Sequence, residues 1–317
     1  IREWHEVDLP EVLGLLDAAM GWVPDEVHES FFRWKHLESP FGSSPAWVMT
    51  DGDRIVGFRI FMRWEFDRHG SVARAVRAVD TATHPEYQGR GIFSRLTLHA
   101  LEDLRAEGVA FVFNTPNDSS RPGYLKMGWE MVGRPPVLVR PRHLLGFPRL
   151  LGARTPAEKW SLGDAGGEPA SAVLADDAAI GRLLASVPTP DRVRTCRSPA
   201  FLAWRYGFGP LHYRAVIAGS TVEDGLALFR VRRRGSLREA AVCDVLVPGG
   251  DRRVQRRLLK RVTVESGADY AIRLGGRPTG FVPLPRQGPT LVWRAVSDPA
   301  AIPLAEWDLT LGDIELF

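Results

Sequence analysis

The sequence predicts an α/β protein made of two successive domains, each with a mixed sheet. Its 317 residues suit two domains of roughly 150 residues better than one. Helix-like and strand-like patterns alternate through residues 1–140, and the same order of patterns recurs after residue 170. We therefore expect two tandem domains, each a mostly antiparallel sheet with a central parallel strand pair flanked by helices.

Residues 141–170 are rich in Pro, Gly and Arg and show no sustained periodicity. Such stretches are typical of the segments that join domains. The predicted organisation is a first domain over 1–140, a linker over 141–170 and a second domain over 171–317.

The elements of the first domain follow from apolar spacing and turn residues. The turn Asp51-Gly52-Asp53 is a strong hairpin signal, and the strands around it should form an antiparallel meander. Gly21 and Gly108 are placed to end helices. The predicted elements are helices over 10–20 and 26–37, strands over 46–50, 54–64 and 72–83, a helix over 91–107, a strand over 109–114 parallel to the one before that helix, and two short strands within 129–140.

The second domain repeats this order of patterns. Its Phe201-Leu202-Ala203-Trp204-Arg205 is similar to Phe31-Phe32-Arg33-Trp34-Lys35, and Asp244 falls where Asp80 does. The spacing from the tryptophan to the aspartate is close but unequal in the two domains, which indicates a diverged repeat. The predicted elements are a hairpin from 213–218 and 226–234, a strand over 240–247, a helix over 251–264 and a last strand over 307–313.

The composition argues against several classes of protein. Hydrophobic residues at 44% and charged residues at 25% are typical of globular proteins. No run approaches the roughly 18 apolar residues of a membrane span, and residues 1–20 lack a signal-peptide pattern, so we expect a cytoplasmic protein with no membrane partner. A net charge of only +3 gives little support for a nucleic-acid partner, and we expect none.

The cysteines and histidines predict neither a disulfide nor a metal site. Cys196 and Cys243 each lack a nearby Cys or His partner. The histidines are scattered, without the paired spacing beside a carboxylate that zinc sites use.

The segment from Val79 to Phe93 carries the strongest functional signal. It runs from an apolar strand through a Gly/Arg turn into the first turn of an amphipathic helix. Unpaired N–H groups and the positive end of the helix dipole then converge on one point, which suits a phosphate. Gly89 and Gly91 allow a ligand to approach the backbone. Arg90 either adds a charged contact or is simply solvated.

This turn and a second motif downstream together resemble the GNAT superfamily of N-acyltransferases. The first motif is Gln88-Gly89-Arg90-Gly91, and the second runs from Asn117 through Ser120 and Tyr124 to Gly128-Trp129. The resemblance covers about residues 1–140. It implies that the second half is a degenerate copy of the same fold.

In that family the first motif cradles the pyrophosphate of acetyl-CoA, and the strand before it binds the pantetheine arm. The resemblance therefore implies acetyl-CoA, or another short acyl-CoA, as co-substrate. Phe93 departs from the family pattern, which has a small residue at this position. Pro122-Gly123 interrupts the helix that family members usually form in this region. The implied cofactor-binding residues are Val79, Thr81, Ala82, Thr83, Gln88, Gly89, Arg90, Gly91, Ile92, Phe93, Asn117, Ser120 and Tyr124.

The resemblance also makes Tyr124 the candidate general acid, because the family commonly uses a tyrosine hydroxyl to protonate the leaving thiolate. The alternative is a tyrosine that only packs beside the cofactor. Asp80 and His84 are the candidates for the base that deprotonates the amine. Asp80 can instead bind the acceptor ammonium or anchor the loop, His84 can be a strand-end cap, and a water can relay the proton.

Four tryptophans bear on where the acceptor binds. Either an acceptor groove is lined by these residues or, as is commoner for tryptophan, they belong to the core: Trp34, Trp47, Trp64 and Trp204.

The turn over 248–253 is the second-half counterpart of the Gly/Arg turn. It lacks the Gln-x-x-Gly pattern and places the acidic Asp251 at the helix start. We expect one acyl-CoA per chain, bound in the first half.

The sequence thus predicts an acetyl-CoA-dependent N-acetyltransferase. It would act by direct transfer in a ternary complex, because no nucleophilic Cys or Ser motif is present. The expected acceptor is a primary amine on a small molecule such as an amino sugar or a peptide-like metabolite, and the protein a monomer or homodimer. A non-catalytic acyl-CoA-binding module and an aminoacyl-tRNA-dependent transferase are the alternatives.

Overall fold

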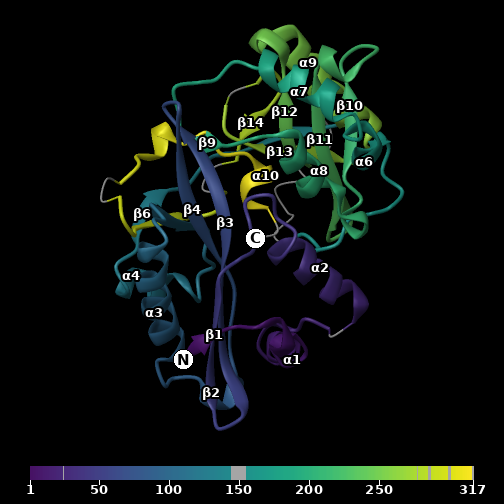
Figure 1. Ribbon diagram of the computed structural model, residues 1–317. Helices are drawn as coiled ribbons and strands as arrows, with labels where there is room; N and C mark the ends of the chain where they lie inside the picture. Colours follow the sequence, from purple (N-terminus) through teal and green to yellow (C-terminus); the bar gives the residue numbers. More distant parts are fainter. Residues whose placement is uncertain (24, 144–154, 277, 285–286, 299–300, 316–317) are drawn as a thin grey trace.

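The computed structural model describes residues 1–23, 25–143, 155–276, 278–284, 287–298 and 301–315. Within these residues the chain forms two mixed sheets, one of eight strands and one of seven. Helices flank both sheets (Figure 1). The predicted fold class, with two mixed α/β sheets, is confirmed.

The first half forms most of the eight-stranded sheet. Its elements are β1 (Arg2–Glu3), α1 (Leu9–Met20), α2 (Glu26–His36), β2 (Ala46–Asp51), β3 (Arg54–Arg68), β4 (Ser71–Thr83), α3 (Ile92–Ala106), β5 (Phe111–Asn114), α4 (Arg121–Lys126), β6 (Glu130–Gly133) and β7 (Val137–Pro141). The meander β2–β3–β4 is antiparallel, as predicted. Strand β5 pairs with β4 in parallel, which is also as predicted.

The second half forms most of the seven-stranded sheet. Its elements are β8 (Glu168–Pro169), α6 (Ala170–Val173), α7 (Asp177–Ser186), β9 (Arg194–Thr195), α8 (Pro199–Gly207), β10 (Arg214–Ile217), β11 (Leu226–Arg234), β12 (Leu237–Leu246), α9 (Arg252–Glu265), β13 (Tyr270–Leu274), β14 (Val282–Pro283), β15 (Leu291–Ala295) and α10 (Leu311–Ile314). The predicted hairpin β10–β11 and the parallel pair β12–β13 are present.

The predicted last strand over 307–313 is wrong, because its second half is the short helix α10. The backbone N–H of Thr310 donates to Asp313 Oδ2 at 2.7 Å and closes a helical turn. The pattern Thr310-x-x-Asp313 is a helix-capping signal that the sequence already contained.

The two halves exchange strands. Strand β15, near the end of the chain, lies between β5 and β6 of the first sheet, and β7 of the first half pairs with β13 of the second sheet. The sheets therefore cross the domain boundaries expected from the sequence, and those boundaries stay a prediction. Residues 144–154 of the expected linker lie outside the described residues.

A symmetric contact joins the two halves. The indole N–H of Trp34 donates to the carbonyl of Trp204 at 2.8 Å, and the indole N–H of Trp204 donates to the carbonyl of Trp34 at 2.8 Å. Their rings stack with centroids 5.4 Å apart. Helices α2 and α8 therefore meet as related copies, which supports the predicted repeat.

Helices cover both faces of the first sheet: α1 and α2 lie on one side, and α3 and α4 on the other (Figure 1). Alternate residues of β3 serve the two cores. Phe58 and Ile60 pack toward α1 and α2, whereas Phe61 packs toward α3. Trp47 and Trp64 are buried in these cores, so the core alternative is correct for them.

Gly57 lets β3 and α3 approach each other closely. A Cβ at this position would lie 2.4 Å from Ile92 Cγ2 and 3.0 Å from Leu96 Cδ1, both on α3. We predict that Gly57→Ala lowers the free energy of unfolding by about 1–3 kcal/mol through overpacking.

The matched control is Gly14→Ala, on the exposed side of α1, where a Cβ meets nothing within 4 Å. This change should raise the free energy of unfolding by up to about 1 kcal/mol through helix propensity. Urea unfolding of both variants measures the difference. Equal effects would contradict the close approach.

Candidate active site

A cleft opens where β4 leaves its neighbours. Its parallel pairing with β5 ends at Arg77 and Phe113. Its register with β3 then shifts, so that Phe58 faces Ala82 but Ile60 faces Val79. A cavity of about 690 Å³ occupies the gap, within the usual size range of small-molecule sites.

Asp80 forms the bulge at this point of β4. Its φ is +38°, one of three positive values among the described non-glycine residues. Such a conformation is costly and clusters at functional or tightly held positions. The bulge takes Asp80 and Thr81 out of the ladder with β3 and turns this part of the strand toward the cavity.

The Gly/Arg turn closes one end of the cavity. Gly89 has φ +77° and Gly91, the N-cap of α3, has φ +73°. A Cβ on either residue would meet nothing within 4 Å, so both glycines border open space. No side chain caps α3 and no acidic residue lies in its first turn. Its free N–H groups therefore suit an anion at this end of the cavity.

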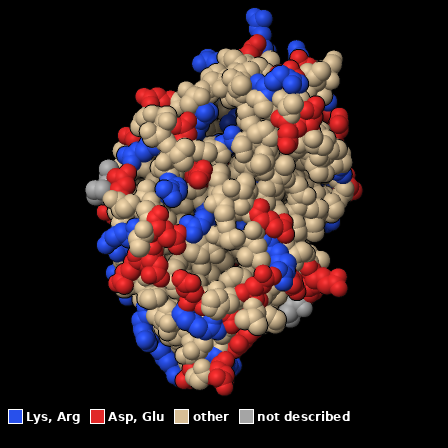
Figure 2. All heavy atoms as spheres, viewed as in Figure 1, with Lys and Arg blue, Asp and Glu red and all other residues tan. Residues whose placement is uncertain are grey.

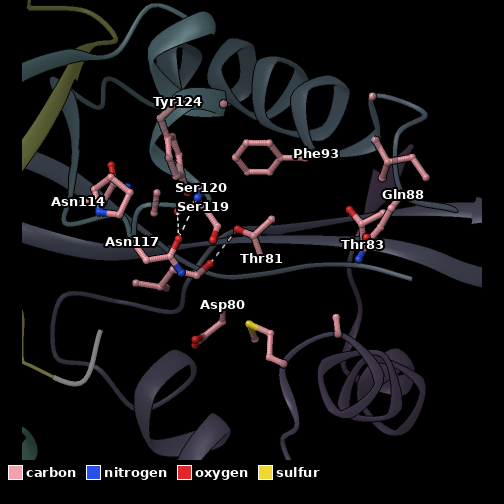
Figure 3. A pocket seen from close by; sticks show the side chains of 18 of the residues that line it. Asp80, Thr81, Thr83, Gln88, Phe93, Asn114, Asn117, Ser119, Ser120 and Tyr124 are labelled. Atoms are coloured by element: carbon pink, nitrogen blue, oxygen red, sulfur yellow. Dashed lines mark hydrogen bonds between the residues drawn. The ribbon is translucent and has the colours of Figure 1, made fainter. Parts of the chain in front are cut away.

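Tyr124 lies at the other end of the cavity, on the short helix α4, with Phe93 beside it and Asp80 on the opposite wall (Figure 3). The Tyr124 ring meets the rings of Phe93 and Trp129 edge-on, with centroids 5.2 Å and 5.1 Å away. These contacts hold the phenol in one orientation.

The residues that depart from the family pattern fit each other. Phe93 fills the space beside Tyr124, and a Cβ at Gly123 would lie 3.0 Å from Phe93 Cε1. Gly123 therefore leaves room for the larger side chain at 93. Pro122 lies in the first turn of the short helix α4, where its missing N–H is not needed, so it is compatible with the start of this helix.

Asn117 and Ser120 line the cavity and bind each other. Asn117 Oδ1 accepts from the backbone N–H of Ser120 at 2.8 Å and from its hydroxyl at 2.9 Å. The pair orders the turn that precedes α4. Both residues thereby help to place Tyr124.

Asp80 is tied to α2. Its Oδ2 accepts from Lys35 Nζ at 2.6 Å and lies 2.8 Å from His36 Nε2, and both partners are buried. Burial alone would raise the pKa of Asp80, but the Lys35 ammonium and the His36 hydrogen bond outweigh it and hold the pKa well below its usual range. A carboxylate so stabilised is a weak base. The geometry favours the anchoring alternative over general-base catalysis.

The second half shows the same anchor. Asp244 accepts from the hydroxyl of Tyr206, which holds in α8 the place of His36 in α2, and from Arg197 Nη2 at 2.7 Å. An aspartate that ties a helix to this part of the strand is thus common to both halves. This symmetry supports a structural role for Asp80.

His84 caps a short turn instead of facing the cavity. Its Nδ1 accepts from the backbone N–H of Glu86 at 3.3 Å, at the start of the 3₁₀ helix Pro85–Tyr87. Its Nε2 lies 2.6 Å from Arg54. The cavity lining does not include His84, so the capping alternative describes its contacts.

Most of the expected cofactor residues line the cavity, namely Val79, Thr81, Thr83, Gln88, Gly89, Gly91, Ile92, Phe93, Asn117, Ser120 and Tyr124. Ala82 and Arg90 do not. Ala82 is buried in the core, and the Arg90 guanidinium lies over the Tyr87 ring at 4.6 Å from its centroid.

Other lining residues were missed from the sequence. Ala19 and Met20 reach the cavity from the end of α1. Asn114 is the last residue of β5, and Thr115 and Pro116 follow it. The carboxyl ends of parallel strands commonly carry ligand contacts. That rule would have singled out residues 114–116, whereas nothing in the sequence brings α1 here.

The corresponding turn of the second half differs. Asp251 caps α9 by accepting from the backbone N–H of Arg253 at 2.7 Å. Its carboxylate thus occupies the start of α9, whereas the corresponding start of α3 has free N–H groups. The expectation of one acyl-CoA per chain stays a prediction.

Charges are mixed over the visible face, with acidic and basic side chains interspersed (Figure 2). In the described part of the chain, no three His, Cys, Asp or Glu residues gather as metal ligands would. No described helix combines the length and apolarity needed to cross a membrane.

Comparison with known proteins supports the same fold and class. Residues 1–132 match the family model of the acetyltransferase (GNAT) domain. No curated protein is significantly similar to this chain.

Solved structures match nearly the whole chain at low sequence identity. A GCN5-related N-acetyltransferase from Anabaena variabilis has a TM-score of 0.64 at 14% identity over 92% of this chain and 71% of its own. A conserved protein from Enterococcus faecalis, described as a probable N-acyltransferase, has a TM-score of 0.63 at 15% identity over 93% of this chain and 72% of its own. A GCN5-related N-acetyltransferase from Kribbella flavida has a TM-score of 0.62 at 14% identity over 93% of this chain and 71% of its own. These likenesses show the fold.

The matched domain identifies an acetyltransferase enzyme. Residues 1–132 carry a domain of the GNAT superfamily. The family that the two sequence motifs indicate is therefore confirmed, as is the enzyme class.

The Asp80 anchor predicts a pH dependence of stability. Because the folded-state pKa of Asp80 is depressed, its contribution is complete above the usual aspartate pKa of about 4 and is lost as the pH falls toward the folded value. Asp80→Asn should lower the free energy of unfolding by about 3 kcal/mol at pH 7 and flatten its decline below pH 4.

Asp53→Asn is the control, because Asp53 is exposed in the β2–β3 turn. It should leave both the stability and its pH profile close to wild type. Denaturant unfolding between pH 2 and 7 measures the effect. An unchanged acid limb in Asp80→Asn would show that the ion pair does not anchor the fold.

Proposed function

We propose that this protein transfers an acetyl or other short acyl group from acyl-CoA to a primary amine of a small molecule. The observation that carries the proposal is the cleft itself, with a glycine turn and the uncapped start of α3 at one end and Tyr124 at the other. Acyl transfer needs both: a place for the cofactor phosphates and a proton donor at the thioester.

The glycine turn fits the pyrophosphate. The empty space beyond Gly89 and Gly91 admits a phosphate against the backbone, and the uncapped α3 presents N–H groups to it. Acetyl-CoA supplies the activated thioester. In this proposal its pantetheine arm runs along the part of β4 that faces the cavity, from Val79 to Thr83, and its reactive end lies near Tyr124.

Tyr124 acts as the general acid in this proposal. Its hydroxyl protonates the departing thiolate, which lowers the barrier to breaking the thioester bond. The base is a solvent water that relays the amine proton, because Asp80 is held as a stable anion and His84 faces away from the cavity. The transfer is direct, in a ternary complex.

The acceptor enters from the side of α1 and α2 in this proposal. Met20 and Asp80 line that wall of the cavity. An amino sugar or a peptide-like metabolite would suit a cavity with such mixed polar and apolar walls. A screen of such amines for CoA release identifies the acceptor class.

The cofactor proposal predicts a specific effect of Gly91→Ala. Both Gly91 and Gly108 have positive φ, +73° and +76°, and a methyl group added to either would meet no atom within 4 Å. Alanine at either site should cost roughly 1–2 kcal/mol of stability through the same backbone strain. Only Gly91→Ala places the methyl in the phosphate site, so it alone should weaken acetyl-CoA binding, by tenfold or more.

Isothermal calorimetry with acetyl-CoA distinguishes the two variants. The control Gly108→Ala, at the far end of α3, should bind like wild type. The cofactor proposal is falsified if wild-type protein binds no acetyl-CoA, or if the two variants bind equally well.

The acid role predicts that Tyr124→Phe lowers kcat by about 100-fold and leaves acetyl-CoA affinity nearly unchanged. The phenyl ring keeps the contacts with Phe93 and Trp129, so the change removes only the hydroxyl. Steady-state CoA release and calorimetry measure the two quantities. Unchanged turnover would remove Tyr124 from the acid role.

A further inference from the structure

Arg59 lies beneath Tyr124 and is fully buried, with an exposed fraction of 0%. It belongs to β3 and points to the α3 face of the sheet, where its guanidinium lies 4.1 Å from the centre of the Phe61 ring. Its Nη1 donates to Tyr124 Oη at 2.9 Å and also to Thr81 Oγ1. The sequence drew no attention to this residue.

Arg59 has no carboxylate partner among the described residues. Its Nε and Nη2 are buried, and neither has a hydrogen-bond partner there. The buried Arg230 also has one nitrogen, Nη2, without a hydrogen-bond partner there, but it pairs with the carboxylate of Glu315 at 2.7 Å. Burying an unpaired cation is costly. A charge kept under such conditions calls for a functional explanation.

Tyr124 provides that explanation. Each hydroxyl has one proton to donate and lone pairs that accept. The Arg59 N–H occupies a lone pair of Tyr124 Oη, so the Tyr124 proton must point away from the guanidinium. Tyr124 lines the cavity, where no described residue accepts this proton. The hydroxyl is therefore a donor toward a ligand.

We propose that Arg59 is a positioning residue that aims the Tyr124 proton at the sulfur of the thioester and stabilises the tyrosinate formed when that proton leaves. This inference rests on the function proposed above. In the step, the amine nitrogen bonds to the acyl carbon, the C–S bond breaks with its electron pair on sulfur, and the Tyr124 proton moves to that sulfur. The amine proton leaves to solvent, and solvent reprotonates the tyrosinate.

The energetic logic is one of preorganised charge. The positive guanidinium is already in place at 2.9 Å from the oxygen that becomes negative, buried against the rings of Phe61 and Tyr124. Such fixed charge acts more strongly than a solvated one and needs no reorganisation during the reaction. The second bond, to Thr81, ties the same guanidinium to the bulge of β4. One side chain thereby links the acid to the strand that borders the cofactor.

The test combines Arg59 and Tyr124 variants. Arg59→Met should lower kcat by about 10- to 100-fold while the KM for acetyl-CoA stays within about twofold. In the Tyr124→Phe background the same change should have little further effect on kcat, because residues that act through one proton are not additive. Arg59→Lys, which keeps the charge, should retain more of the kcat than Arg59→Met.

Arg63→Met is the control, since Arg63 lies on the same strand but pairs at the surface with Glu107 at 2.6 Å. It should behave like wild type. Chemical rescue provides a readout that mere folding cannot give: guanidinium ion should restore part of the kcat of Arg59→Ala, but not when Tyr124 is also changed to Phe. The assay follows CoA release from acetyl-CoA, with the best amine of the screen or with water as acceptor.

The outcomes separate the two ideas. A large effect of Tyr124→Phe with an equal loss from Arg59→Met in both backgrounds would overturn the positioning role and leave the proposed function standing. An unaltered kcat in Arg59→Met, or a loss confined to the KM, would do the same. No effect of Tyr124→Phe would remove the acid role of Tyr124 and this inference with it, and no CoA release at all would remove the proposed function as well.

Discussion

The buried ion pair between Asp80 and Lys35 joins the parts of the molecule on which the cleft depends. Asp80 is the strained residue of the β4 bulge, and Lys35 belongs to α2, which packs against α8 through the paired tryptophans. The bulge turns β4 toward the cavity, and the ion pair keeps it there against the cost of a positive φ. Strand, helix and second half are thereby held in one arrangement around the site.

The two halves share a strand-then-helix arrangement but differ at the start of the helix. The parallel pairs β4–β5 and β12–β13 are each paired over only three residues. Helix α3 follows β4, and helix α9 follows β12, beyond the point where this pairing ends. In the first half the helix start is a glycine with no side-chain cap, and in the second half Asp251 provides the cap. A local choice of cap residue thus decides whether a helix end is available to an anion.

The strand exchange makes the two halves interdependent. Strand β15 completes the first sheet between β5 and β6, and β7 extends the second sheet beside β13. The inner end of the cleft therefore lies on a sheet to which both halves contribute. This arrangement also explains why the core runs without interruption from α1 to the residues around α10.

The class of fold, the order of most elements and the glycine turn could be predicted from local sequence. These depend on local periodicity, on turn residues and on Gly91, whose positive φ no other residue adopts easily. The remaining features depend on contacts between segments far apart in the chain. Strands β7 and β15 pair across the two halves, and this pairing could not be predicted, because the sequence of a short apolar strand does not specify which strand it pairs with. Asp80 became an anchor, and Arg59 came to lie beside Tyr124, because burial and charge partners arise only when distant segments meet.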